Sequence, residues 1–261
     1  MQSISKSKIY TLFELRLLSE QLSLNNIAHI QISDLALIQK RIYELDKYFE
    51  SNWVLDSKSL TKYWNNINST LKDIIGENDS VDSFTGLIKQ YQEVEAKLRK
   101  LNSSQELSLL DFYTKKSCDI KLLRKIIQNK SAIPNDTPLW TYYDLATEIN
   151  DDLTDFHEDL TTFNYNKYAI ELLFNGKSKT KLKFMEFLTQ LSKSLDFFSN
   201  YSNPFEKYLY QQTNSIIQIN FSLLNKLSLS KMNPESSSLY KALKGKAVDN
   251  NKYDIISTPT S

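Results

Sequence analysis

Apolar residues recur along most of the chain at the three- and four-residue intervals that place them on one face of an α-helix. Because glycine is favoured just after a helix end, Gly76 is expected to end the helix predicted at residues 60–75, and residues 76–83 are predicted as a loop. Few segments depart from this pattern, so the sequence predicts an all-α protein. The expected helices cover residues 9–24, 34–49, 60–75, 84–101, 105–129, 139–160, 164–174, 179–199 and 205–229, with a short one near 239–243.

Composition agrees with one helical domain. The chain has 261 residues, of which 41% are hydrophobic, and its net charge is +1. It contains Gly 4 and Pro 5, where average usage gives about 18 and 13, and it lacks a glycine-rich phosphate loop. We expect a single domain over residues 1–231, followed by a short helix and a flexible polar tail over residues 232–261. The near-zero net charge argues against a nucleic-acid partner.

The sequence gives little indication of disulfide bonds, zinc binding or membrane insertion. One Cys and two His exclude a disulfide framework and a Cys/His zinc site. The first residues lack the apolar run of a signal peptide. The longest uncharged stretch, residues 208–225, contains amides such as Gln218 and Asn220, which are unfavourable in hydrocarbon. We therefore expect no integral membrane segment and a cytoplasmic location.

Acidic residues form a row along the helix predicted at residues 139–160. Steps of three or four residues place them on one face, and an apolar stripe lies about 100° around the axis. Like charges at this spacing destabilise a helix by about 0.2–0.5 kcal/mol per pair, whereas Mg²⁺ binds carboxylates together with substrate phosphates. The row predicts a Mg²⁺ site beside an apolar pocket, and a solvated acidic face is the alternative. Its members are Asp144, Glu148, Asp151, Asp152, Asp155 and Asp159.

Residues 148–155, EINDDLTD, resemble the second aspartate-rich motif of trans-prenyl diphosphate synthases, QxxDDxxD. Asp151, Asp152 and Asp155 match its three aspartates, and Glu148 replaces the glutamine. The longer acidic run through Asp159 resembles that of squalene/phytoene synthases. Both families belong to the class I isoprenoid synthase superfamily. The resemblance implies a helical bundle around a central apolar cavity, in which two facing acidic helices bind Mg²⁺ and the diphosphate of a prenyl diphosphate substrate.

Other positions extend this resemblance. Lys116 and Ser117 stand where prenyl synthases carry a Lys-Thr pair that contacts diphosphate, and Lys177 follows Gly176 as in a basic loop of the family. The catalytic residues would be Lys116 and Arg124, which add positive charge near the diphosphate. The resemblance also implies a set of metal ligands. Three further substrate-binding candidates come from their positions: Arg124 lies on a basic helix, with surface ion pairing as the alternative, and Tyr143 and Phe156 border the acidic row, with core packing as the alternative. The metal ligands would be Asp151, Asp152, Asp155, Glu148 and Asp159, and the substrate-binding residues Lys116, Ser117, Arg124, Lys177, Tyr143 and Phe156.

The first aspartate-rich motif of the family is absent. Its nearest counterpart is the pair Asp46 and Glu50, four residues apart on the helix predicted at 34–49. These two are candidate metal ligands, and the alternative is an exposed pair of acids neutralised by Arg41 or Lys47. The arginine pair that follows the first motif in the family is also missing, as is the metal motif of terpene cyclases.

These observations predict a Mg²⁺-dependent, isoprenoid synthase-like enzyme that ionises a prenyl diphosphate and couples, cyclises or deprotonates the allylic cation. One alternative is a non-catalytic helical protein that retains the fold, has lost the first metal site, and binds an apolar ligand or a partner subunit. Another is a helical interaction module whose acidic face binds a basic partner. A homodimer is left open.

Overall fold

The computed structural model describes residues 32–76, 81–98, 107–131, 137–160, 162, 164–200, 204–227 and 241–242. Every regular element within these residues is a helix, which confirms the all-α prediction. The helix predicted at residues 9–24 lies outside the described residues. So does most of the short helix near 239–243, of which residues 241–242 are helical. None of the described helices combines the length and apolar character needed to span a bilayer.

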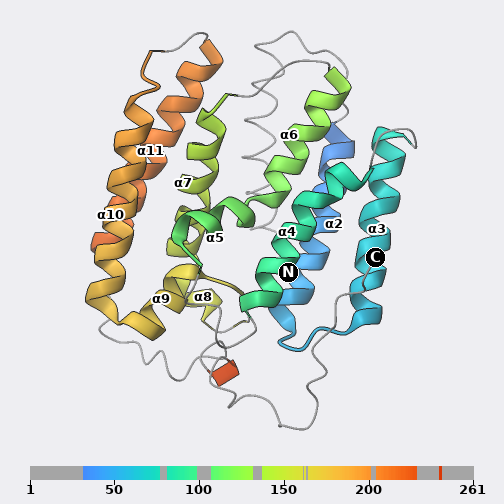
Figure 1. Ribbon diagram of the computed structural model, residues 1–261, viewed down its shortest axis with the longest axis horizontal. Coiled ribbons are helices and arrows are strands. Elements are labelled where there is room, and N and C mark those ends of the chain that lie inside the picture. The colour runs from blue at the N-terminus through green and yellow to red at the C-terminus, as the bar shows by residue number, and fades with distance from the viewer. Residues whose placement is uncertain are drawn as a thin grey trace.

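The helices form two groups that lie side by side, with α5 (Leu109–Lys116) between them (Figure 1). One group contains α2 (Ile32–Ser51), α3 (Ser57–Ile75), α4 (Val81–Leu98) and α6 (Cys118–Ser131). The other contains α7 (Leu139–Thr154), α8 (Phe156–Asp159), α9 (Lys167–Asn175), α10 (Lys177–Asp196) and α11 (Pro204–Lys226). α5 contacts α4 in the first group and α7 in the second.

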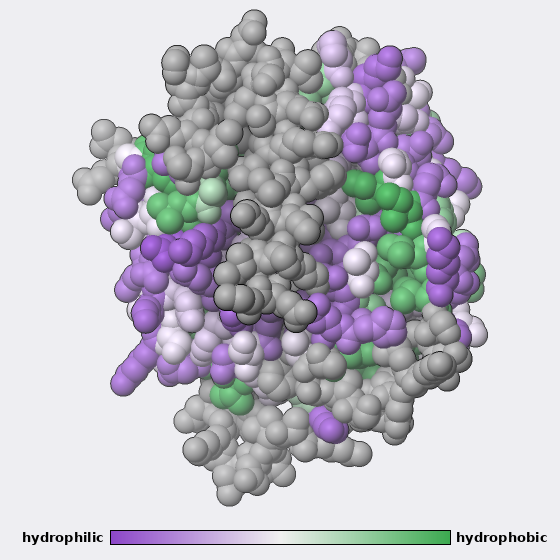
Figure 2. Space-filling model, turned by 180° about the vertical axis from the view of Figure 1, so that it is seen from behind, coloured by the Kyte–Doolittle hydropathy of each residue, from purple (hydrophilic) through white to green (hydrophobic). Residues whose placement is uncertain are grey.

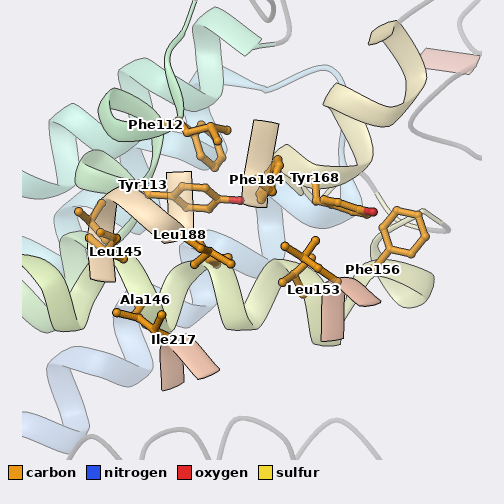
Figure 3. Close-up of a cluster of buried hydrophobic side chains, with 14 of the residues drawn as sticks. Phe112, Tyr113, Leu145, Ala146, Leu153, Phe156, Tyr168, Phe184, Leu188 and Ile217 are labelled. Carbon is orange, nitrogen blue, oxygen red and sulfur yellow. The ribbon is translucent and has the colours of Figure 1, made fainter. Parts of the chain in front are cut away.

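Each group of helices encloses its own apolar cluster. The cluster of α2, α3, α4 and α6 is mainly aliphatic and includes the buried Cys118. The cluster of α5 and α7–α11 is rich in aromatic side chains (Figure 3). In it, Phe184 packs edge to face against Tyr113 and Tyr168, with ring centroids 6.4 and 5.0 Å apart, and Tyr168 meets Phe156 in the same way at 5.4 Å. These rings stabilise the packing of α5, α8, α9 and α10 against one another.

Local signals explain several helix ends. The Asp56 carboxylate accepts a hydrogen bond from the Ser59 backbone N–H at 2.8 Å and so caps α3. Gly76 follows α3 with a φ of 89°, which confirms the predicted stop. Asn166 caps α9 through the Ala169 N–H at 2.9 Å, and Gly176, at a φ of 73°, separates α9 from α10.

Several predicted boundaries were wrong; α3, for example, begins at Ser57 and α9 at Lys167. α4 begins at Val81, inside the segment predicted as a loop. The helix predicted at 105–129 is divided at Ser117, where a ψ of 37° leaves the helical region, into α5 and α6. The helix predicted at 139–160 ends at Thr154, and Asp155, with a ψ of 2°, precedes the short α8. Apolar spacing continues through both breaks, so periodicity alone could not reveal them.

Single large apolar side chains are exposed on several elements. On the face seen in Figure 2, small hydrophobic areas lie among hydrophilic ones. Because isolated exposed apolar residues are normal on protein surfaces, we assign no docking role to them. Those at least 41% exposed are Leu37, Val54, Leu110, Leu182, Phe197 and Ile219.

Candidate functional site

The acidic row of α7 and α8 points into the protein. Asp144, Glu148, Asp152 and Asp159 are only 2, 7, 0 and 4% exposed, whereas Asp151 and Asp155 are half-buried. Burying a carboxylate is unfavourable unless it is hydrogen-bonded or paired. The alternative of a solvated acidic face is therefore wrong for the four buried members of the row. These four residues are likewise not exposed for binding a basic partner.

The Asp152 carboxylate accepts three hydrogen bonds from three different residues. Its Oδ1 accepts a bond from Lys116 Nζ at 2.6 Å, and its Oδ2 accepts from the Tyr113 hydroxyl and the Lys167 backbone N–H, both at 2.7 Å. Lys167 is the first residue of α9, where free backbone N–H groups and the helix dipole favour a negative charge. The Asp152 carboxylate thus links α5, α7 and α9.

Lys116, the last residue of α5, faces three acids of α7. Besides Asp152, its Nζ lies 3.4 Å from Asp151 Oδ2 and 3.8 Å from Glu148 Oε2. Burial alone would lower the pKa of Lys116, but attraction to these carboxylates outweighs it and holds the pKa well above its usual value. Lys116 therefore stays charged at neutral pH. Near Asp152, burial raises the pKa of the Tyr113 hydroxyl well above 10.0, so this hydroxyl remains a proton donor.

A second buried ion pair lies at the beginning of the row. Both terminal nitrogens of Arg124, on α6, donate to the two carboxylate oxygens of Asp144, one of them at 2.8 Å. The Arg124 guanidinium also lies over the Trp140 ring, 4.3 Å from its centroid. A bidentate pair with a stacked guanidinium fixes the position of the arginine. The pair connects the two groups of helices, because α6 and α7 belong to different ones.

The end of the row is held by amides. Asp159 Oδ1 and Oδ2 accept bonds from the side chains of Asn164 and Asn166, both at 2.9 Å. Asn166 also donates to the Asp152 backbone carbonyl at 2.5 Å. Burial raises the pKa of Asp159 to about 7, although the bond from Asn166 lowers it. The helix break at Asp155 separates Asp159 from the straight part of the row.

The other predicted substrate-binding residues are dispersed. Ser117 is buried, and its hydroxyl lies 3.4 Å from the Tyr113 carbonyl oxygen. Tyr143 and Phe156 are 1 and 0% exposed and belong to the aromatic core. Lys177 is exposed at the first residue of α10, and no hydrogen bond or ion pair among the described residues joins it to the row.

Asp46 and Glu50 lie on α2, apart from the helices that carry the row. They are half-buried, and α2 packs mainly against α3 and also contacts α6. The alternative partner Arg41 instead bonds Glu44 at 2.9 Å, one turn along the same helix. The sequence spacing correctly predicts that Asp46 and Glu50 lie on one helix. That helix packs mainly against α3, and so the two residues are not placed beside the acidic row of α7.

Sequence reasoning missed the residues that surround Asp152. Tyr113 and Asn166 carried no distinctive signal, although an asparagine before a helix is a recognisable N-cap. It also missed a buried cluster at the junction of α9 and α10. There Glu171 accepts bonds from Lys167 at 3.0 Å and Lys183 at 2.7 Å, and these bonds lower its pKa against the effect of burial.

The donors suit a hard cation only in part. Carboxylate oxygens are the ligands that Mg²⁺ prefers, and Glu148 and Asp151 converge on the same Lys116 nitrogen. Within the described residues, however, no group of three or more His, Cys, Asp or Glu side chains is arranged to hold a metal ion. Magnesium binding would thus require side-chain movement or a ligand oxygen that completes the coordination.

Comparison with known proteins finds no matching family model, no matching curated protein and no matching solved structure. The fold and the site themselves define an all-α protein with a buried cluster of acidic and basic side chains where α5, α7 and α9 meet.

Proposed function

We propose that this protein is a Mg²⁺-dependent, isoprenoid synthase-like enzyme that acts on a prenyl diphosphate. The observation that carries the proposal is the inward orientation of the acidic row beside Lys116. Asp151 keeps 27% of its side chain exposed, and Lys116 keeps 13%. A negatively charged diphosphate bridged by Mg²⁺ to Asp151 could thus reach both groups from solvent.

Each residue has a defined role in this proposal. Magnesium, when bound by Asp151, Asp155 and Glu148, supplies charge neutralisation and Lewis acidity. Lys116 holds its positive charge where the diphosphate leaves with the electron pair of the broken C–O bond. The allylic cation would then couple, cyclise or lose a proton among apolar side chains. Arg124 is paired with Asp144, which fixes its guanidinium, and in this proposal it adds positive charge to the site from that fixed position.

Pyrophosphate release tests the proposal. The full chain is incubated with Mg²⁺ and, in separate reactions, with geranyl, farnesyl and geranylgeranyl diphosphate. Release with at least one substrate is expected, and Asp151→Asn should reduce it. Asp73→Asn is the matched control, because Asp73 is exposed on α3. Folded protein that releases no pyrophosphate with any of the three substrates overturns the proposal.

The second candidate is a non-catalytic helical binding or partner protein. One observation favours it: Arg124 and Lys116 already neutralise Asp144 and Asp152 without any ligand. Such a row would serve packing between helices. Thermal unfolding with Mg²⁺, with pyrophosphate and with both distinguishes the candidates. Binding at 100 times Kd stabilises a protein by about 2.7 kcal/mol, so an enzyme should melt higher with both present, whereas the non-catalytic protein should not respond.

A further inference from the structure

We infer that Asp152 is a positioning residue that holds Lys116 in place, and that metal binding falls to Asp151 on the more exposed side of the helix. This inference rests on the proposed function and refines it. The motif resemblance assigns Asp151 and Asp152 the same role as metal ligands, because both match aspartates of the motif. The surroundings of the two side chains differ in three respects.

The first difference is the number of donors that each carboxylate already accepts. Asp152 accepts from Lys116, from the Tyr113 hydroxyl and from the Lys167 backbone N–H at 2.6–2.7 Å. A metal ion at Oδ2 would have to displace the Tyr113 hydroxyl and the Lys167 N–H, and one at Oδ1 would have to displace Lys116. Each displaced donor would be buried without an acceptor, which is unfavourable. Among the residues that the structure describes, the Asp151 carboxylate has a single long contact, 3.4 Å to Lys116. Its oxygens can take a metal ion at much lower cost.

The second difference is access. The Asp152 side chain is 0% exposed, whereas the Asp151 side chain is 27% exposed. A hydrated Mg²⁺ ion keeps several of its waters when it binds. Such an ion fits the half-open position of Asp151 and not the closed position of Asp152.

The third difference is the rigidity of the neighbours. The Tyr113 ring packs edge to face against Phe112 at 5.1 Å and against Phe184 at 6.4 Å, which fixes its hydroxyl (Figure 3). The Lys167 N–H belongs to the first turn of α9, which Asn166 caps. Both donors to Asp152 Oδ2 are therefore held by their own elements. Asp152 transmits this rigidity to Lys116, whose flexible side chain would otherwise sample several rotamers.

Paired titrations test the inference. Magnesium chloride and inorganic pyrophosphate are the probes, and calorimetry measures the affinity for each while the other is saturating. The variants are Asp152→Asn, Tyr113→Phe and Asp151→Asn, with Asp73→Asn as the control. Tyr113→Phe removes one donor to Asp152 and keeps the ring packing, so it remains informative even where Asp152→Asn fails to fold. Circular dichroism checks folding.

The two roles give different patterns. Asp151→Asn should raise the half-saturating Mg²⁺ concentration by about tenfold, because it removes a ligand. Asp152→Asn should leave that concentration within about twofold of wild type and weaken pyrophosphate binding by about tenfold, the effect of one charge-assisted hydrogen bond. Tyr113→Phe should act in the same direction by about threefold. The inference is overturned if Asp152→Asn raises the Mg²⁺ requirement as much as Asp151→Asn does, or if it leaves pyrophosphate affinity unchanged.

Failure of the proposed function appears separately, as wild-type protein that does not bind pyrophosphate with Mg²⁺. In that event, a double-mutant cycle of Asp152→Asn and Lys116→Met in urea unfolding measures the energetic coupling between Asp152 and Lys116. We expect the combined change in the unfolding equilibrium constant to differ from the product of the single changes by at least about tenfold. A difference below about twofold would overturn the inference on its own.

Discussion

Replacing Arg124 by methionine should strongly destabilise the protein. The change removes the partner of Asp144, which is only 2% exposed, and leaves its charge buried. Breaking a buried pair from one side typically costs about 3–5 kcal/mol. Loss of the guanidinium over Trp140, at 4.3 Å, contributes to this cost. Because a domain has about 5–15 kcal/mol of total stability, the variant should still fold at low temperature.

Urea unfolding followed by far-ultraviolet circular dichroism measures this effect as a shift of the midpoint. Arg41→Met is the matched control. Arg41 bonds Glu44 at 2.9 Å, but the two side chains are 32 and 34% exposed. Exposed pairs contribute about 0–1 kcal/mol, so this change should have little effect. A loss below about 1 kcal/mol for Arg124→Met would refute the reasoning that the pair is buried and structural.

A double replacement separates the charge from the packing. When Arg124→Met is combined with Asp144→Leu, no buried charge remains, and apolar replacement of an entire buried pair is often neutral or stabilising. The double variant should therefore regain most of the stability that Arg124→Met loses. A double variant as unstable as Arg124→Met would mean that packing of the arginine stem, and not the unpaired carboxylate, causes the loss.

Three further measurements follow from the buried polar and aromatic contacts. In wild type, the pKa of Asp159 is raised to about 7 from 3.8, so the folded state binds the proton more tightly. Its stability should fall by at most about 4 kcal/mol between pH 4 and pH 7, and Asp159→Asn should flatten this slope in unfolding experiments. Asn220→Ala should cost about 1–3 kcal/mol in urea unfolding, because Asn220 donates to the Ala146 carbonyl and accepts from Asn150, both at 2.8 Å; a neutral result would contradict the amide link between α7 and α11. Phe184→Ala should cost about 3–5 kcal/mol in the same assay, and a much smaller loss would mean that the aromatic core repacks.

Properties that depend on residues close in sequence were predicted well. Apolar spacing identified most of the helices, and Gly76 marked the end of α3, because helix phase and a glycine stop are properties of neighbouring residues. The amides of the uncharged stretch were expected to argue against a membrane segment; in α11 Asn220 is 0% exposed, whereas Gln211 and Gln218 lie on the exposed face. The acidic row was expected to share a face, and its members on α7 do so.

Properties that depend on contacts distant in sequence were not predictable. Tyr113 lies 39 residues before Asp152, and Arg124 lies 20 residues before Asp144. No spacing rule connects such residues, because tertiary packing brings them together. The break at Ser117 was hidden for a related reason: the apolar pattern before it packs into one core and the pattern after it into the other. At Asp155 the apolar residues on both sides pack into the same core, so the pattern continues without a sign of the break.

The helix break at Asp155 determines where a ligand could bind. A continuous helix would have spread the row over four turns, whereas α7 ends beside Asp151 and Asp155. The carbonyl end of a helix carries a partial negative charge, and the last turn of α7 contains no basic residue to offset it. This end therefore favours a positive charge, and Lys116 of α5 supplies one 3.4 Å from Asp151 Oδ2. The buried Asp144 and Asp152 are paired with Arg124 and Lys116 and stabilise the contacts between helices, so the metal binding that we propose would fall to the half-buried end of α7.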